Sequence, residues 1–283
     1  MIKSSKYFKA LIGKSLLQLE EICAKIDTYY YIKKEIKLDK FGKPKLKNGQ
    51  PVNRILMPSK GELKTLQTIL NKRVFSKIAF PTCVYGSVKG KSNITNALQH
   101  KGKVYKFLTD LRDFYPSITS KMVYDALIVE GFSPDIARLV TKLTTYKNQL
   151  PQGTPTSPIV ANIVFKKVDL AILKTLENKN ITYTRYVDDL TFSSKDNFQY
   201  LHCILLKHIT DFGLNINRKK TNYKKGITDI TGVQVKNNII KETHSFKKKL
   251  ERADLPEISL KGCLAYKARI RSFNTYSNFK ALL

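Results

Sequence analysis

The chain has 283 residues, 42% of them hydrophobic and 10% aromatic, which excludes a disordered polypeptide and predicts one compact unit with two or three subdomains. Its 51 Lys and Arg residues outnumber 22 Asp and Glu residues, for a formal net charge of +29. This excess indicates a polyanionic partner, nucleic acid ahead of an acidic membrane, although a lysine-rich, AT-biased genome accounts for part of it.

Cysteine spacing and hydropathy predict a cytoplasmic protein. Cys23, Cys83, Cys203 and Cys263 have no Cys-x-x-Cys spacing, so the sequence signals neither a zinc site nor a disulfide framework. No apolar run in the sequence approaches the roughly 20 residues that cross a bilayer, so no membrane partner is expected.

The first part of the chain predicts helices and a pair of strands. Residues 3–26 carry apolar positions at the spacing of one or two short amphipathic helices. Residues 29–32 and 52–57 read as strands on either side of a loop rich in Lys, Gly and Pro, and a helix follows from Ser59. Arg54 falls in the second strand, where a solvated side chain is an equally good interpretation.

A buried strand is predicted at residues 104–111, with Asp110 near its carboxyl end, where open sheets place functional groups. His100 precedes this strand, and a single histidine there is more often a structural hydrogen-bond partner than a catalyst. Two helices are expected next, over residues 120–130 and from Pro134, where a Ser-Pro pair is typical of a helix start.

Residues 150–158, Leu-Pro-Gln-Gly-Thr-Pro-Thr-Ser-Pro, form a turn-rich loop that leads into a helix over residues 159–177. That helix is apolar on most faces, which predicts that it is buried against the sheet. Its N-terminus offers free backbone N–H groups to an anion. Another helix is expected after Leu201.

Adjacent carboxylates occupy the tip of a predicted hairpin. Residues 181–185 and 190–194 are rich in β-branched and aromatic residues, and Asp188 and Asp189 lie between them. Neighbouring carboxylates repel unless they are protonated or neutralised by a cation, so the pair indicates a salt-bridged turn or a metal site. Asp-Asp is also a common turn dipeptide.

The order of these elements is that of a polymerase palm, and the residues resemble reverse transcriptases. Asp-Leu-Arg-Asp-Phe-Tyr at 110–115 is similar to their first catalytic motif, residues 150–158 to the second, and Tyr-Val-Asp-Asp at 186–189 to the third. Gly-Leu-Asn-Ile-Asn-Arg-Lys-Lys-Thr at 213–221 resembles the fourth. The resemblance covers roughly residues 50–235.

Two further elements narrow the resemblance to retron reverse transcriptases. Asn-Ala-Leu-Gln-His at 96–100 is similar to their Asn-Ala-x-x-His element, and Ile-Thr-Gly at 230–232 to their Val-Thr-Gly element. This chain departs from the pattern at Ile230, where relatives carry Val, and at Tyr115, where many carry Phe. Both replacements keep the size and shape class of the side chain.

The resemblance implies an α+β fold, a right-hand polymerase with fingers, a palm of antiparallel sheet on helices, and a small helical thumb. Residues 1–103 would hold the N-terminal helices and fingers, and residues 104–235 the palm, with part of the fingers between 117 and 150. The thumb would be residues 236–283, with a strand at 233–235 before it and helices at about 243–253 and 260–272.

The resemblance also implies phosphoryl transfer assisted by two Mg²⁺ ions, for which Mn²⁺ can substitute. Asp110, Asp188 and Asp189 would be the catalytic residues and metal ligands. Asp113 competes with Asp110 for that role, since it lies three residues further on and could instead cap a helix or pair with a lysine.

Nucleotide binding is implied for four positions. Tyr115 would stack under the sugar and exclude a 2′-hydroxyl, unless it is a plain core aromatic. Arg54 would clamp the triphosphate, and Gln152 would contact the nucleotide or template. Lys220 would lie near the pyrophosphate, with Lys219 an equally good candidate.

Nucleic-acid binding is implied for Asn96 and His100 and for the basic C-terminal helices, and it should depend strongly on salt. The C-terminal candidates are Lys247, Lys248, Arg252, Lys267, Arg269 and Arg271.

By resemblance, the chain is an RNA-directed DNA polymerase that copies a cognate structured noncoding RNA (msr-msd) into a branched RNA–DNA hybrid (msDNA), primed from a guanosine 2′-hydroxyl. Its partners would be that RNA, its DNA product, dNTPs, an effector protein of antiphage defence, and a host ribonuclease H for template removal. Two alternatives stay open: another defence-associated or group II intron-like reverse transcriptase with ordinary priming, and a catalytically idle RNA-binding scaffold.

Overall fold

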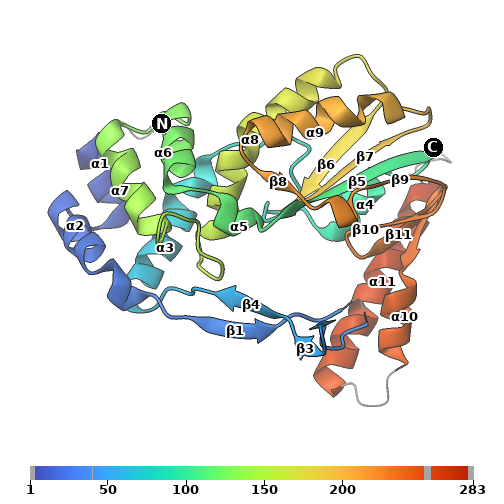
Figure 1. The fold of residues 1–283 in the computed structure, drawn as a ribbon, viewed down its shortest axis with the longest axis horizontal. Coiled ribbons are helices and arrows are strands. Elements are labelled where there is room, and N and C mark those ends of the chain that lie inside the picture. The colour runs from blue at the N-terminus through green and yellow to red at the C-terminus, as the bar shows by residue number, and fades with distance from the viewer. Residues whose placement is uncertain (1–3, 40, 252–255, 280–283) are drawn as a thin grey trace.

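An antiparallel sheet built from distant parts of the chain lies at the centre of the molecule (Figure 1). The computed structural model describes residues 4–39, 41–251 and 256–279. The sheet runs in the order β6-β7-β5-β8, and β9 pairs with the other half of β5. Its strands are β5 (Tyr105–Arg112), β6 (Thr182–Tyr186), β7 (Asp189–Ser194), β8 (Asn215–Ile216) and β9 (Asn222–Lys225). The fold is therefore α+β, as predicted.

Two helices cover one face of this sheet (Figure 1). They are α8 (Ser157–Thr175) and α9 (His202–Asp211). The rings of Phe107 and Phe192 on neighbouring strands stack 5.6 Å apart, and Tyr183 stacks on Phe192 at 4.7 Å. These aromatic side chains alternate with polar ones along the strands, so the aromatic face packs under the helices. The opposite face carries polar side chains such as Thr184 and Ser193, which are also buried.

Helices from the first half of the chain pack beside the sheet. The buried amide of Gln67 donates to the Leu143 carbonyl at 2.8 Å, which ties two of these helices together. The helices are α1 (Ser5–Ile12), α2 (Leu16–Ala24), α3 (Gly61–Arg73), α5 (Phe114–Ser117), α6 (Ser120–Val129) and α7 (Pro134–Thr144), with short 3-10 helices at Ile26–Tyr29 and Phe75–Lys77. Two further 3-10 helices, Gln199–Leu201 and Arg218–Lys220, lie in the second half of the chain.

A hairpin arm extends below the sheet in Figure 1. We call residues 33–39 and 41–56 the arm; it pairs β1 (Lys33–Ile36) with β4 (Asn53–Leu56) and carries the short β2 (Leu46–Lys47) and β3 (Gln50–Pro51) at its far end. Near that end, the ammonium of Lys248 lies 5.6 Å from the centre of the Phe41 ring. The arm thus reaches the C-terminal helices.

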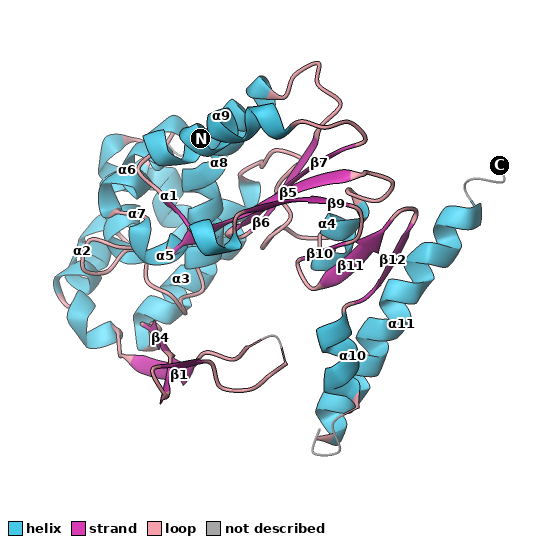
Figure 2. Cartoon of the chain, turned by 45° about the vertical axis from the view of Figure 1, so that its right-hand side comes forward, coloured by secondary structure: helices cyan, strands magenta, loops and turns pink. Residues whose placement is uncertain are grey.

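The C-terminal part is built on a second, three-stranded sheet (Figure 2). Its strands are β10 (Thr228–Ile230), β11 (Val233–Lys236) and β12 (Ile239–Glu242), and its helices are α10 (His244–Leu250) and α11 (Glu257–Phe279). With α4 (Asn93–Leu98) it forms a separate small core of Ile94, Ala97, Ile230, Val233, Val235, Ile240 and Ile270. The predicted strand at 233–235 is β11, but its two partners were not predicted.

No helix among the described residues is long and apolar enough to cross a membrane. The four cysteines all carry free thiols.

Candidate active site

The predicted carboxylates meet because β5 and β7 pair antiparallel. Asp110 lies directly opposite Asp189 in the strand register. The Leu111 N–H donates to the Asp188 carbonyl at 3.0 Å, so the hairpin tip is joined to the end of β5 by the backbone. Asp110 is 5% exposed, and the other two carboxylates are half-buried.

Burial and neighbouring negative charge raise the pKa values of Asp188 and Asp189. Burial, followed by the charges of Asp188 and Asp110, raises the pKa of Asp189 to about 7. Burial and the charge of Asp110 also raise the pKa of Asp188. Such a group gains from a bound cation, and its carboxylate oxygens are the ligands that hard divalent ions such as Mg²⁺ prefer.

Two residues of the fourth motif hold Asp110. The Lys220 ammonium donates to Asp110 Oδ2 at 2.7 Å, and the Asn217 side-chain amide donates to Oδ1 at 2.9 Å. Burial lowers the pKa of Lys220, but its hydrogen bond to Asp110 and the nearby carboxylates outweigh burial, so the net shift is upward. Lys220, and not Lys219, therefore contacts the acids. Asn217 was not singled out from the sequence, although it lies inside that motif.

The acids open onto a cleft of about 680 Å³, which we call the main cleft. Its lining includes cationic side chains opposite the acids, polar side chains, and the arm. The functional candidates along it are Arg54, Asp110, Tyr115, Gln152, Asp188, Asn217 and Lys220, with Asp113 beside them. Every predicted nucleotide-binding residue thus lines the same cleft.

Tyr115 fits both of its interpretations. It lies on α5 and packs against the main core, with its ring 5.7 Å from that of Phe114. Burial and then the charge of Asp188 raise the pKa of Tyr115 to about 12, so its hydroxyl stays protonated beside the acids. Tyr115 therefore packs against the core and also lines the main cleft.

The Gln152 loop is fixed to the base of the arm. The Gln152 carbonyl accepts a hydrogen bond from the Met57 N–H at 2.8 Å. Gly153 has φ +99°, and a Cβ there would lie 3.3 Å from Pro58, so both its conformation and its surroundings favour glycine. The loop therefore presents Gln152 to the cleft at a fixed place.

A smaller hollow of about 240 Å³ lies on the other side of the acids. It shares Asp110 and Lys220 with the main cleft and adds Asp189. Asp229 of β10 and Thr231 of the turn between β10 and β11 also line it. The acids thus stand between two spaces that could hold two different molecules.

Comparison with known proteins identifies this arrangement. Residues 47–235 match the family described as reverse transcriptase (RNA-dependent DNA polymerase). The chain belongs to the reverse transcriptase family. It is 36% identical over 169 residues to the retron Ec86 reverse transcriptase of Escherichia coli, covering 59% of this chain and 52% of that protein. The resemblance to retron reverse transcriptases is confirmed.

A second relative and a solved structure are consistent with this family. The chain is 31% identical over 201 residues to the retron Se72 reverse transcriptase of Salmonella heidelberg, covering 67% of this chain and 53% of that one. It spans about half the length of the curated relatives it matches. Telomerase from Candida albicans, solved with a fragment of telomeric RNA, shares the fold, with a TM-score of 0.50, 14% identity, and coverage of 80% of this chain and 50% of that one.

Asn96 and His100, which the sequence predicts to bind RNA, are buried side chains in this reverse transcriptase. Asn96 is 1% exposed and His100 is fully buried. The His100 ring nitrogens lie 2.6 Å from the Ser193 hydroxyl and 2.7 Å from the Thr184 hydroxyl. His100 therefore fastens the segment after α4 to the central sheet, and RNA binding by these two residues stays a prediction.

The basic C-terminal residues are largely accessible. Lys247, Lys248, Arg269 and Arg271 are exposed, and Lys267 is half-buried. Three of them line a hollow of about 490 Å³ between β12 and the two C-terminal helices. Arg252 lies outside the described residues.

The acid cluster of the reverse transcriptase is not a closed metal site in this arrangement. Among residues 4–39, 41–251 and 256–279, no three or more His, Cys, Asp or Glu side chains surround a common point. Both oxygens of Asp110 already accept hydrogen bonds from Lys220 and Asn217. The raised pKa values of Asp188 and Asp189 nonetheless fit a divalent cation.

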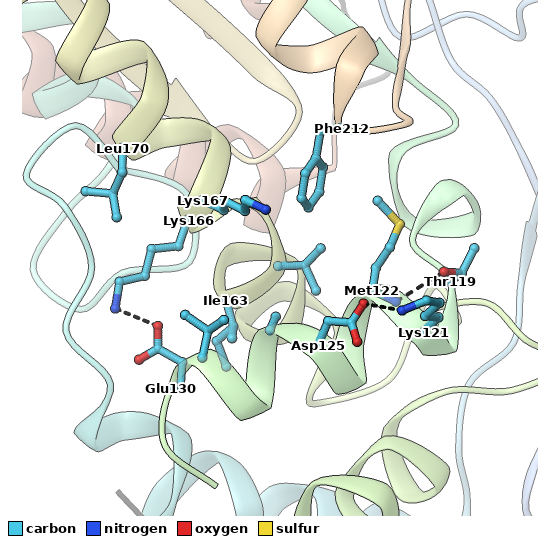
Figure 3. A pocket seen from close by; sticks show the side chains of 13 residues that line it. Thr119, Lys121, Met122, Asp125, Glu130, Ile163, Lys166, Lys167, Leu170 and Phe212 are labelled. Atoms are coloured by element: carbon cyan, nitrogen blue, oxygen red, sulfur yellow. Dashed lines mark hydrogen bonds and ion pairs between the residues drawn. The ribbon is translucent and has the colours of Figure 1, made fainter. Parts of the chain in front are cut away.

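A separate groove of about 610 Å³ lies between α6 and α8 (Figure 3). Its floor includes Met122, Ile163 and Phe212. The acidic side chains on its rim are ion-paired: Lys121 with Asp125 at 2.7 Å, and Lys166 with Glu130 at 2.6 Å. The catalytic candidates do not line it, and its apolar floor does not suit a nucleotide.

Proposed function

We propose that this reverse transcriptase copies a cognate structured noncoding RNA into a branched RNA–DNA hybrid, primed from a guanosine 2′-hydroxyl. Its similarity to several retron reverse transcriptases supports this, together with the elements at 96–100 and 230–232. The observation that best supports a polymerase site is that Asp110 lies opposite Asp189 in the strand register. The acids line both a cleft large enough for a nucleotide and a second hollow.

Asp110, Asp188 and Asp189 would hold two Mg²⁺ ions, or Mn²⁺ in their place. Bound metal ions would supply activation of the primer hydroxyl and stabilisation of charge on the leaving pyrophosphate. The smaller hollow would receive the priming nucleotide, because it opens onto the same acids from the other side. Lys220 would leave Asp110 for the phosphates, since its side chain is 61% exposed.

The main cleft would bind the incoming dNTP. Arg54, exposed on β4, would clamp the triphosphate with its guanidinium fork. Tyr115 would lie beneath the sugar and exclude a 2′-hydroxyl, and Gln152 would contact the base pair from its fixed loop. Lys220 would serve as the charge stabiliser near the pyrophosphate.

In this proposal residues 1–103, with part of 117–150, are the N-terminal helices and fingers of a right-hand polymerase. Residues 104–235 are the palm and residues 236–283 the thumb. The palm and thumb are tightly joined, because β12 pairs with β11 across that boundary. The exposed Lys and Arg residues of α10 and α11 would bind the RNA and its DNA product.

The similarity to retron reverse transcriptases also supports a role in antiphage defence. The polymerase and its msDNA would act in antiphage defence with an effector protein, and a host ribonuclease H would remove the copied template. An intron-like enzyme with ordinary priming and a catalytically idle RNA scaffold are the two rival functions.

Sequencing the nucleic acid that co-purifies with the protein tests the proposal. We expect DNA joined to RNA through a bond that debranching enzyme cleaves, and we expect no DNA with the double variant Asp188→Asn, Asp189→Asn. The control is Asp211→Asn, an exposed aspartate paired with Lys207 on α9. Linear DNA insensitive to debranching would favour ordinary priming. DNA unchanged in the double variant would refute catalysis by these acids.

A further inference from the structure

A fully buried ion pair lies beneath the hairpin tip that carries Asp188 and Asp189. Arg185 on β6 and Asp169 on α8 are both 0% exposed. The Arg185 Nη2 donates to Asp169 Oδ2 at 2.7 Å, and Nε donates to Oδ1 at 3.0 Å. This two-pronged geometry fixes the plane of the guanidinium.

The remaining guanidinium nitrogen reaches the hairpin tip. Nη1 of Arg185 donates to the Val187 carbonyl at 3.0 Å and to Asn162 Oδ1 at 2.9 Å. The guanidinium also stacks over the Phe165 ring, with its carbon 4.6 Å from the ring centre. Since Val187 immediately precedes Asp188, the buried ion pair is linked directly to the peptide that orients the acids.

That peptide has a conformation that needs support. Val187 has φ +60°, which a β-branched residue rarely adopts. On its other side lies Gly86, where an added Cβ would be 2.3 Å from the Val187 nitrogen. Asn162 joins the two sides, because its amide donates to the Gly86 carbonyl at 2.8 Å while its oxygen accepts from Arg185.

We propose that Arg185 is a positioning residue that holds the strained Val187 peptide and thereby sets the direction of the Asp188 and Asp189 carboxylates toward Asp110. This inference rests on the proposed role of those acids as metal ligands. Arg185 itself touches neither substrate nor metal, since it is fully buried. It acts through the Val187 carbonyl, and Asp169 and Asn162 keep it in place.

A role confined to stabilising the core makes different predictions. In that case, weakening the pair would lower the melting temperature without changing how the folded enzyme binds metal. A positioning role predicts a change in metal affinity that is larger than the loss of stability explains. It also predicts that relieving the strain at Val187 restores that affinity.

The test uses Arg185→Lys, which keeps the buried charge but cannot bond Asp169 and the Val187 carbonyl in the same geometry. Mn²⁺ binding is followed by electron paramagnetic resonance, alongside the Mg²⁺ dependence of primer extension and the melting temperature. We expect both metal affinities to fall by roughly 10- to 100-fold, as for other groups that orient metal ligands. Adding Val187→Gly to Arg185→Lys should recover most of the lost metal affinity, because glycine adopts positive φ without strain. The control is Arg138→Lys, the same substitution at an exposed arginine on α7.

Unchanged Mn²⁺ affinity in folded Arg185→Lys, or a loss that Val187→Gly does not restore, would overturn the inference. If Arg185→Lys does not fold, Asn162→Ala replaces it, since that change removes only the link to Gly86 and one partner of Arg185. Asp188→Asn in the wild-type background separates the two proposals. If it binds Mn²⁺ as wild type does, the proposed metal site is wrong and this inference falls with it. If it loses Mn²⁺ while Arg185→Lys retains it, only the positioning role is refuted.

Discussion

The Asn96 side-chain amide donates a hydrogen bond to the Thr231 hydroxyl at 3.2 Å, across 135 residues of sequence. Asn93, on the same helix, donates to the Thr231 carbonyl at 3.0 Å. The two elements that distinguish retron enzymes in this sequence, at 96–100 and 230–232, are therefore in contact with each other. Together they attach the three-stranded C-terminal sheet to α4.

This contact predicts a loss of stability rather than of RNA binding. Asn96→Ala removes a buried donor and leaves Thr231 without it, so the free energy of unfolding should fall by about 1–2 kcal/mol. Urea unfolding measures this, and RNA affinity of the folded variant should match wild type. Gln99→Ala, an exposed change at the end of the same helix, is the control. Weaker RNA binding with unchanged stability would restore a direct RNA role for Asn96.

Alanine substitutions of Lys220 and of Lys219 should differ sharply in their effect on kcat. Lys220→Ala removes the cation beside Asp110, and we expect kcat to fall by roughly 10²-fold, as for a lost proton donor or charge stabiliser. Lys219→Ala should leave kcat within about twofold, since that side chain is exposed and Lys220 already occupies the site. Single-turnover primer extension measures both. Equal losses would show that Lys220 has no special role.

Tyr115 should control the choice of sugar. Tyr115→Ala opens the floor of the main cleft, so ribonucleotide incorporation relative to deoxyribonucleotide should rise by roughly 10- to 100-fold. Tyr115→Phe should preserve selectivity, because the exclusion is steric and does not use the hydroxyl. Primer extension with matched dNTP and rNTP pairs measures this ratio. If Tyr115→Ala lowers stability but leaves the ratio unchanged, the residue is only a core aromatic.

His100 should make the fold sensitive to mild acid. Burial, and then the charges of Lys106 and Lys103, lower the pKa of His100 to about 3 in the folded protein. Its unfolded pKa is about 6.5, so the unfolded chain binds the extra proton below that pH. The stabilisation is fully present above pH 6.5 and is lost as pH falls toward 3, by about 2 kcal/mol between pH 7 and pH 5.

Unfolding free energies measured at those two pH values test the prediction for His100. His100→Gln should reduce this part of the pH dependence, because glutamine can still reach the Ser193 and Thr184 hydroxyls but does not titrate. An identical pH dependence in wild type and variant would show that other groups are responsible.

Local signals in the sequence were sufficient to predict the helices and strands around the three acids. A Ser-Pro pair starts both α7 and α8, and the alternating pattern around Asp188 gives the hairpin of β6 and β7. The order of the motifs then predicted that Asp110 approaches the hairpin. These features depend on residues close in sequence, or on the order of motifs along the chain that the resemblance to the family provides.

Features that depend on distant partners were not predictable in the same way. β10 has three residues and β12 ends in Lys and Glu, so each is a strand only because β11 lies beside it. The burial of His100 depends on hydroxyls from β6 and β7. Arg185 reads locally as an ordinary strand residue, and its partner Asp169 lies on a helix that precedes the hairpin.

The approach of Phe41 to Lys248 has a topological consequence. Because the arm and the C-terminal helices touch beyond the main cleft, they complete a ring with the central sheet. If the proposed function holds, nucleic acid at the acids would be enclosed by the arm on one side and by the C-terminal helices on the other.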